Sequence, residues 1–318
     1  MTRVAAIDCG TNSIRLLIAD THDTPAGPAL TDVLRQMRVV RLGQDVDATG
    51  EFAPEALTRT FAAIDEYALL IREHGATAIR FVATSATRDA RNRDEFIAGV
   101  RERLGVDPEV VPGDVEAALS YAGAASVAPA APGTHNLVID LGGGSTEFVL
   151  GNGHGPVASR SMDMGCVRLT ERFWRLEQPT TESIAAARAQ VNAVLDEVQR
   201  DVDFSLVDRI VGVAGTITTL TAAALGLQKY DSTLIHGAEV GFDKLESAVA
   251  FMLEAGRETR ASLGFMHPGR VDVIAAGALI YGCILERVGR ASSGRITTAT
   301  ASEHDILDGI ALGLGTRN

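Results

Sequence analysis

One pattern occurs twice in this sequence, and the repeat limits the folds that the chain can adopt. Residues 4–19 read VAAIDCGTNSIRLLIA, and residues 137–150 read LVIDLGGGSTEFVL. Each copy contains an apolar strand, an Asp, a Gly two residues later, a Ser five residues later and a second apolar strand. Asp8 thus aligns with Asp140, and the copies begin the two halves of the chain. The repeat predicts two structurally similar halves that each open with a strand, a loop and a strand.

Helical stretches alternate with short apolar strands in the rest of each half. The first half is expected to contain a helix at 54–74, a strand at 78–84, a helix at 89–104, a strand at 108–111 and a helix from Asp114. The second half is expected to contain a helix at 181–200, a strand at 209–215, a helix from Thr216 and a last helix at 302–315 capped by Ser302. This alternation is typical of βαβ units, so the predicted fold class is α/β with mostly parallel sheets.

The length of the chain favours two domains. At 318 residues, the chain is too long for one ordinary hydrophobic core. Residues 121–136 read YAGAASVAPAAPGTHN, a stretch rich in Ala, Pro and Gly that marks a natural boundary. We expect a first domain at 1–125, a second domain at 126–301 and a C-terminal helix near 302–318 that packs back on the first domain.

The charge and the apolar pattern argue against some functions. The net charge is −12, and Lys229 and Lys244 are the only lysines. An acidic surface argues against nonspecific binding to nucleic acid or to a membrane surface. No apolar run reaches the ~18 residues that a membrane span needs. The start of the chain also lacks the apolar segment of a signal peptide. We therefore expect a soluble, cytoplasmic protein.

The cysteines indicate neither a disulfide framework nor a zinc site. Cys9, Cys166 and Cys283 lie far apart in the sequence, with no CxxC pair and no His at ligand spacing. Each of the three is expected to be a small buried residue.

The loop of each copy has the composition of a phosphate-binding site. A tight turn exposes successive backbone N–H groups, and small polar side chains add donors to such a concavity. Glycines let the backbone come closer to a ligand because they carry no Cβ. An Asp at the end of the preceding strand is placed to hold a metal ion. A plain hairpin would explain either loop alone, but it explains a matched pair poorly. The loop residues are Thr11, Asn12, Ser13, Gly142, Gly143 and Gly144.

Two further polar loops lie at predicted strand-to-helix junctions. Residues 83–88 read ATSATR and end on Arg88, and residues 214–218 read AGTIT and include Gly215 and Thr216. Helix N-termini favour anions at such junctions. In a duplicated fold, the four loops would converge on one interdomain cleft, where a phosphorylated ligand is expected. The sequence has no GxxxxGK[ST] motif and therefore no P-loop of the nucleotide-hydrolase type.

These loops belong to a longer series of motifs that extends over almost the whole chain. In order, they are AIDCGTNSIRLLIAD, VATSATRDARN, GDVEAALSYAGA, VIDLGGGSTEFVLG, SMDMGCVRLTERF, GVAGTITTL, RVDVIAAGALI and SEHDILDGIAL. The series resembles the exopolyphosphatase and guanosine pentaphosphate phosphohydrolase family of the actin, sugar-kinase and Hsp70 superfamily. The resemblance implies two duplicated actin-like domains, which are ribonuclease H-like, with an interdomain cleft.

The resemblance also implies a role for each matching residue. Glu116, at the start of a helix, matches the catalytic base that activates the attacking water. The carboxylates on the metal side match Asp8, Asp140 and Glu147. The phosphate-binding residues match Thr11, Asn12, Ser13, Arg88, Gly142, Gly143, Gly144, Ser145, Thr146, Gly215 and Thr216. The implied cofactor is Mg²⁺ or Mn²⁺, and the implied assembly is a homodimer.

The expected activity is hydrolysis of terminal phosphates from inorganic polyphosphate. Guanosine pentaphosphate 5′-phosphohydrolase activity would use the same site, and the motifs do not separate the two substrates. A nucleotide-binding regulator without turnover is a third interpretation, against which Glu116 argues because a pure binder needs no base. An ATP-dependent sugar kinase is a fourth, but no sugar-site signature is visible. Larger family members carry a further C-terminal region of HD type. Its absence here leads us to expect a preference for short polyphosphates.

Overall fold

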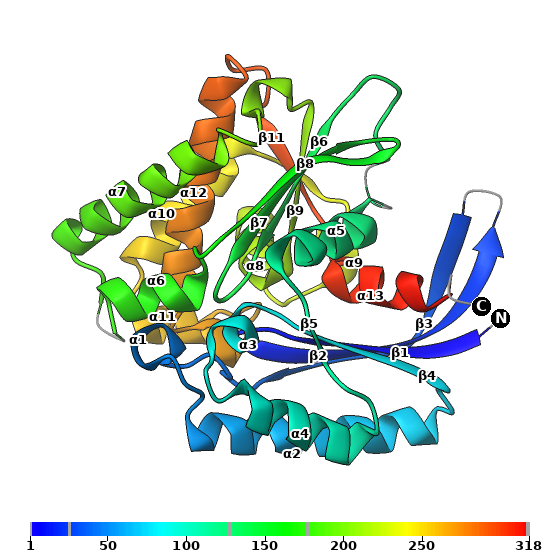
Figure 1. Ribbon diagram of the computed structural model, residues 1–318. Coiled ribbons are helices and arrows are strands. Elements are labelled where there is room, and N and C mark those ends of the chain that lie inside the picture. Colours follow the sequence, from blue (N-terminus) through cyan, green and yellow to red (C-terminus); the bar gives the residue numbers. More distant parts are fainter. Residues whose placement is uncertain (1, 25–26, 126, 128, 176–177, 316–318) are drawn as a thin grey trace. The chain divides into compact units, whose positions relative to one another are not determined.

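The computed structural model describes residues 2–24, 27–125, 127, 129–175 and 178–315. Contacts divide the chain into two units (Figure 1). Unit 1 contains Met1–Gly123 and Ile306–Asn318, and unit 2 contains Ala124–Asp305. Unit 1 has a five-stranded sheet and unit 2 has a six-stranded sheet, each packed against helices. The predicted α/β class is confirmed.

The sheet of unit 1 has the strand order β3-β2-β1-β4-β5. Its first three strands are antiparallel, and β4 and β5 run parallel to β1. The strands are β1 Thr2–Cys9, β2 Ser13–Thr24, β3 Gly27–Val39, β4 Ala78–Ala83 and β5 Glu109–Val110. The helices are α1 Val46–Thr49, α2 Pro54–Glu73, α3 Ser85–Asp89, α4 Arg93–Leu104, α5 Gly113–Ala124 and α13 Ile306–Gly315.

Strand β1 is buried on both faces, because helices cover both sides of the sheet of unit 1. Alternate residues of a strand point to opposite faces. Ala5 and Ile7 face the core formed with α2 and α4, whereas Val4 and Ala6 face α13 (Figure 1). Helix α2 begins with Pro54, which is favoured in the first turn. Its buried side chains recur at helical spacing; they include Leu57, Thr60, Ile64, Tyr67 and Ile71.

The sheet of unit 2 has the strand order β10-β11-β9-β6-β7-β8. Its strands are β6 Asn136–Leu141, β7 Thr146–Asn152, β8 Gly155–Met162, β9 Arg209–Val213, β10 Glu239–Gly241 and β11 Thr298–Ala301. Its helices are α6 Cys166–Phe173, α7 Thr181–Val198, α8 Ala214–Ala224, α9 Ser232–Ile235, α10 Phe242–Glu254, α11 Arg257–Ser262 and α12 Ile274–Ala291, with short 3₁₀ turns η1 Phe204–Leu206 and η2 Pro268–Arg270. The strands β6, β7 and β9 repeat the arrangement of β1, β2 and β4.

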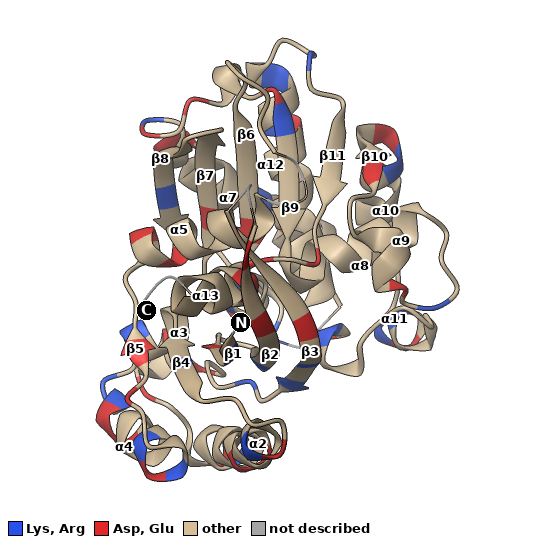
Figure 2. Ribbon diagram, turned by 90° about the vertical axis from the view of Figure 1, so that its right-hand side faces the viewer, with Lys and Arg blue, Asp and Glu red and all other residues tan. Residues whose placement is uncertain are grey.

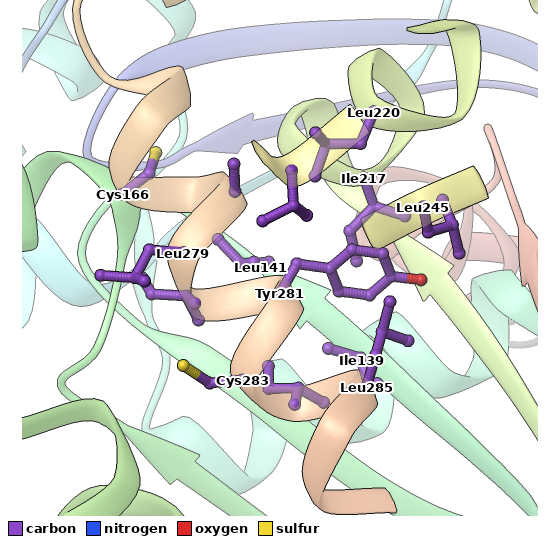
Figure 3. Close-up of a cluster of buried hydrophobic side chains, with 14 of the residues drawn as sticks. Ile139, Leu141, Cys166, Ile217, Leu220, Leu245, Leu279, Tyr281, Cys283 and Leu285 are labelled. Atoms are coloured by element: carbon purple, nitrogen blue, oxygen red, sulfur yellow. The ribbon is translucent and has the colours of Figure 1, made fainter. Parts of the chain in front are cut away.

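Helix α12 runs through the core of unit 2. Its side chain Tyr281 is fully buried among Ile139, Ile217 and Leu245 (Figure 3). Cys166 and Cys283 lie in the same core, and Cys9 lies in the core of unit 1. The prediction that the cysteines are small buried residues is confirmed. Among the described residues, no helix combines the length and the apolar character needed to cross a membrane.

Some predicted element boundaries are wrong. The last helix begins at Ile306 and not near Ser302. The Ser302 N–H donates to the Gly212 carbonyl of β9, and its hydroxyl donates to the His304 carbonyl, so Ser302 extends the pairing of β11 with β9 by one bond and does not cap the helix. The helix predicted from 89 begins at Arg93, after the separate short helix α3. The strand predicted to reach 215 ends at Val213, where α8 begins.

Candidate active site

The two repeated loops have the same backbone turn. In unit 1, the Gly10 N–H donates to the Ser13 carbonyl at 3.0 Å. In unit 2, the Gly142 N–H donates to the Ser145 carbonyl, also at 3.0 Å. The repeat seen in the sequence is therefore present in the local backbone of both units.

The Asp residue that precedes each loop has a different cross-strand neighbour in the two units: a cation in unit 1 and an anion in unit 2. Asp8 of β1 lies opposite Arg15 of β2, and Arg15 donates two hydrogen bonds to Asp8 Oδ2 at 2.6 and 2.9 Å. Asp140 of β6 lies opposite Glu147 of β7. Residues directly opposite on antiparallel strands share a face of the sheet, with Cβ atoms about 5 Å apart. Unit 1 thus holds an ion pair where unit 2 holds two carboxylates.

Glu116 is a buried acid in the first turn of α5. It is only 7% exposed, and its Oε2 accepts a hydrogen bond from Arg88 Nη1 at 2.6 Å. Burial raises the pKa of the Glu116 carboxyl, because desolvation disfavours its charged form. The Arg88 guanidinium and the Thr84 hydroxyl oppose this rise in the pKa, and the negative charge of Asp8 adds to it. Unit 1 therefore brings the predicted base, an arginine and an aspartate together.

Arg88 is held in place by backbone as well as by the acid. Its Nη1 also donates to the Val111 carbonyl at 2.9 Å, directly before the turn that opens α5. Arg88 lies on α3, the short helix that follows β4. One nitrogen of the guanidinium thus fixes both the acid and the start of its helix.

Several buried hydroxyl and amide oxygens in unit 1 have no partner among the described residues. These atoms are Thr11 Oγ1, Asn12 Oδ1 and Thr87 Oγ1. Buried polar atoms are normally hydrogen-bonded. The two threonine hydroxyls can donate to a polar ligand such as phosphate, whereas the amide oxygen can only accept a hydrogen bond.

In unit 2, the glycine loop leads into Thr146, whose side chain already makes a hydrogen bond within the unit. The Thr146 hydroxyl is fully buried and donates to the Met164 carbonyl. Only the backbone of Thr146 is thus left for the predicted phosphate-binding role. Ser145 is also buried, at 3% exposure.

An arginine that the sequence did not reveal lies against the fourth predicted loop. A Cβ on Gly215 would lie 2.3 Å from Cζ of Arg270, so the guanidinium lies directly against this glycine. Arg270 Nη1 also donates to Thr219 Oγ1 at 3.3 Å. No carboxylate of the described residues lies within ion-pair distance of Arg270. Helix α8 itself carries no charged residue (Figure 2), so Arg270 supplies positive charge near its N-terminus.

Arg270 was missed because its partner is distant in the sequence. It is the first residue of RVDVIAAGALI, a segment for which the family resemblance implies no residue role. The signal that was available is the glycine at 215, where a close approach by another group was to be expected. Ala214, directly before it, has φ +70°, a left-handed conformation that is unusual for alanine.

The carboxylates of unit 2 fit one divalent cation better than a closed metal cage. No group of three or more His, Cys, Asp or Glu residues suited to a metal ion occurs in the described part of the chain. Mg²⁺ is usually held by one or two protein carboxylates together with substrate phosphates and water. The facing pair Asp140 and Glu147 meets that requirement, and Ser161 orients Glu147 by donating to Oε1 at 2.7 Å.

Comparison with known proteins gives matches over most of the chain. Residues 17–313 match the family described as "Ppx/GppA phosphatase family". Exopolyphosphatase 2 of Mycobacterium tuberculosis is 49% identical over 322 residues, which cover 99% of each chain. A guanosine-5′-triphosphate,3′-diphosphate pyrophosphatase of Vibrio atlanticus is 32% identical over 236 residues, which cover 73% of this chain and 45% of that protein.

Solved structures match over the same length. A crystal structure of an exopolyphosphatase-like protein has a TM-score of 0.93 and 44% identity, and covers 99% of this chain and 98% of its own. The Ppx/GppA family member of Aquifex aeolicus has a TM-score of 0.78 and 30% identity, and covers 98% of this chain and 97% of its own. These matches confirm the predicted duplicated actin-like fold.

Proposed function

The chain belongs to the Ppx/GppA phosphatase family, and we propose that it hydrolyses the terminal phosphate of inorganic polyphosphate. The observation that carries the chemistry is the buried Glu116 carboxyl, bonded to Arg88 beside the first loop. The match of 49% identity to an exopolyphosphatase over the full chain supports the choice of substrate.

In the proposed reaction, Glu116 acts as the general base. It takes a proton from a water molecule as the water oxygen attacks the terminal phosphorus. The bridging P–O bond breaks, inorganic phosphate is released, and the shortened chain leaves with the bridging oxygen. Transfer of this kind needs mainly alignment and charge neutralisation. A base with a raised pKa accepts a proton more readily than an ordinary carboxylate.

The phosphate groups are bound by the loops of each unit. In unit 1, we assign this role to Thr11, Asn12, Ser13 and Arg88. In unit 2, we assign it to Gly142, Gly143, Gly144, Ser145, Thr146, Gly215 and Thr216, and we add Arg270 because of its position against Gly215. Arginine suits phosphate because its planar guanidinium can donate two parallel hydrogen bonds.

Asp140 and Glu147 would hold a divalent cation, Mg²⁺ or Mn²⁺. When bound, the cation would neutralise negative charge on the phosphate oxygens. Asp8 was expected to share this role, but its Oδ2 already bonds Arg15 at 2.6 Å, so its charge is largely compensated. We assign the cation to the pair in unit 2, because Asp140 and Glu147 place two carboxylates on one face of the sheet.

The proposal is tested by measuring phosphate release from a ladder of polyphosphate lengths, with guanosine pentaphosphate as a parallel substrate. Release from polyphosphate that requires Mg²⁺ and stops with a chelator is the expected result. If phosphate is released only from guanosine pentaphosphate, that nucleotide is the substrate in place of polyphosphate. If both compounds bind but neither releases phosphate, the protein is a regulator. The same ladder tests the expected preference for short chains. A homodimer and a cytoplasmic location complete the proposal.

A further inference from the structure

Each phosphate loop is bonded on one side to the segment that follows the third strand of its unit. In unit 1, this segment is residues 40–43, directly after β3, and we call it the first strap. The N–H groups of Val40 and Arg41 donate to the Asn12 carbonyl at 3.1 and 2.9 Å, and the Gly43 N–H donates to the Thr11 carbonyl at 2.9 Å. The carbonyls of the loop thus point toward the strap.

Unit 2 repeats this arrangement with a different sequence. The second strap consists of residues 164–168, after β8. Here, the Cys166 N–H donates to the Gly142 carbonyl at 3.0 Å, and the Val167 N–H donates to the Gly143 carbonyl at 2.8 Å. The Arg168 side chain donates from Nε to the Gly144 carbonyl at 2.9 Å. Three consecutive loop carbonyls therefore point toward the strap.

A glycine makes the closest approach in each strap. A Cβ on Gly43 would lie 2.4 Å from Thr11 Cγ2, and a Cβ on Gly165 would lie 2.2 Å from the Gly143 carbonyl oxygen. Thr11 and Gly143 are equivalent positions in the repeat, each one residue after the aligned glycine. In each unit, a strap glycine thus lies against the equivalent loop residue, at its side chain in unit 1 and at its carbonyl in unit 2.

The strap contacts decide where the loop N–H groups point. In a trans peptide, the carbonyl of one residue and the N–H of the next point in opposite directions. The N–H groups of Gly143, Gly144 and Ser145 therefore point away from the second strap, and that of Asn12 points away from the first. None of these four N–H groups has an acceptor among the described residues. The three successive N–H groups of the second loop form a nest for an anion, and the first loop supplies one further donor.

We propose that the two straps are positioning elements for phosphate binding: by bonding the loop carbonyls, they turn the loop N–H groups toward the substrate. Gly43 and Gly165 are positioning residues because only glycine allows the close approach. This inference rests on the proposed function, in which the same loops bind phosphate. It also assigns a role to the segment SMDMGCVRLTERF, for which the family resemblance implies no residue role.

The test replaces each strap glycine with alanine and uses controls that create an equal clash elsewhere. Gly43→Ala is matched by Gly99→Ala in unit 1, where a Cβ would lie 2.4 Å from Phe61 Cε1. Gly165→Ala is matched by Gly264→Ala in unit 2, where a Cβ would lie 2.2 Å from the Gln228 carbonyl oxygen. Binding of tripolyphosphate is measured by calorimetry in a Glu116→Gln background, so that the probe is not consumed. Thermal unfolding of each variant is recorded.

Both strap variants should bind tripolyphosphate at least about tenfold more weakly, which corresponds to the loss of roughly one hydrogen bond to a charged group. The controls should bind within about twofold of the parent at a similar loss of thermal stability. In the active enzyme, KM should rise in the strap variants more than kcat falls. Equal weakening in strap variants and controls, or unchanged binding in the strap variants, would overturn the proposal.

Two further variants extend the test, and Arg168→Gln covers the case in which an alanine variant does not fold. Thr11→Ser removes the methyl group that a Cβ on Gly43 would meet most closely, and it should restore part of the binding lost in Gly43→Ala. Arg168→Gln removes the bond to the Gly144 carbonyl without adding bulk and should also weaken binding. The straps do not position the loops if Thr11→Ser leaves the affinity of Gly43→Ala unchanged and Arg168→Gln leaves the affinity of the parent unchanged. Failure of the parent enzyme to hydrolyse polyphosphate would refute the proposed function, but the binding comparison would still be decisive for the straps.

Discussion

Arg88 and Glu116 form a close ion pair in unit 1, with 2.6 Å between Nη1 and Oε2. The acid is nearly inaccessible to solvent, whereas the arginine side chain is 22% exposed. Only Nη1 of Arg88 is used in bonds to the described residues, so Nε and Nη2 can reach another group. Arg88 can therefore hold the base and a phosphate at the same time.

The first prediction concerns the base. Glu116→Gln keeps the shape of the side chain but cannot accept a proton, so kcat should fall by about 10²–10⁴-fold. Tripolyphosphate binding, measured by calorimetry, should remain. The control is Glu55→Gln, an exposed glutamate in the first turn of α2, which should leave kcat unchanged. Wild-type turnover in Glu116→Gln would show that another group is the base.

The second prediction concerns pH. Glu116 must be deprotonated to act, so kcat/KM should fall as the pH drops through its raised pKa. The Arg88 cation lowers that pKa, and Arg88→Gln should therefore move the acidic limb of the profile to higher pH. The measurement is the pH dependence of kcat/KM in both proteins. Arg91→Gln, which removes an exposed arginine, is the control. If the acidic limb lies at the same pH in Arg88→Gln, then Arg88 does not affect the pKa of the base.

The third prediction concerns the divalent cation. Asp140→Asn and Glu147→Gln each remove one of two facing carboxylates, so the Mg²⁺ concentration for half-maximal activity should rise at least about tenfold. Titration of activity with Mg²⁺ measures this change. Glu197→Gln, at an exposed position on α7, should show the parent value. If the concentration changes for neither carboxylate variant, the cation is bound elsewhere.

The fourth prediction concerns Arg270. Arg270→Lys keeps the charge but loses the planar donor pair, so KM for polyphosphate should rise by roughly 10–100-fold. Gly215→Ala should have a similar effect, because its Cβ would occupy the place of the guanidinium. Steady-state kinetics give KM and kcat for both variants. The control is Arg295→Lys, at a site where an exposed arginine bonds backbone and Asp208. Unchanged KM in Arg270→Lys would remove Arg270 from the binding residues.

The fifth prediction concerns stability away from the loops. Phe96 is fully buried and its ring lies 5.8 to 6.4 Å from those of Phe52, Phe61 and Phe81. Phe96→Ala should lower the free energy of unfolding by about 3–5 kcal/mol, because it removes apolar contacts and leaves a cavity. Denaturant unfolding measures the change. Phe251→Ala, at a side chain that is 41% exposed, should change it by less than about 0.5 kcal/mol.

The features that could be predicted from the sequence are local. Spacing alone placed Asp8 and Asp140 before their loops, because strand, turn and strand follow within a few residues. The same is true of α2, whose start at Pro54 and apolar spacing lie within one segment. The role of Glu116 came from the family resemblance and not from the spacing of residues.

The features that escaped prediction depend on contacts between distant segments. Arg270 lies against Gly215, more than fifty residues earlier, and no local pattern reports that contact. The straps were missed for the same reason, since a carbonyl's direction depends on a partner elsewhere in the chain. Ser302 had the sequence of a helix cap, but its N–H bonds the carbonyl of Gly212 on a neighbouring strand, and this contact overrides the local signal.

Helix α13 has a consequence for how the protein is made. Its side chains Ile306 and Ile310 complete the second hydrophobic face of β1, together with Val4 and Ala6. On a ribosome, these isoleucines are synthesised only after all of unit 2. N-terminal domains usually fold first during synthesis. Here, the first sheet to emerge must wait for residues near 306–315 before its second face is covered, whereas unit 2 is one continuous segment that can fold as soon as it has emerged.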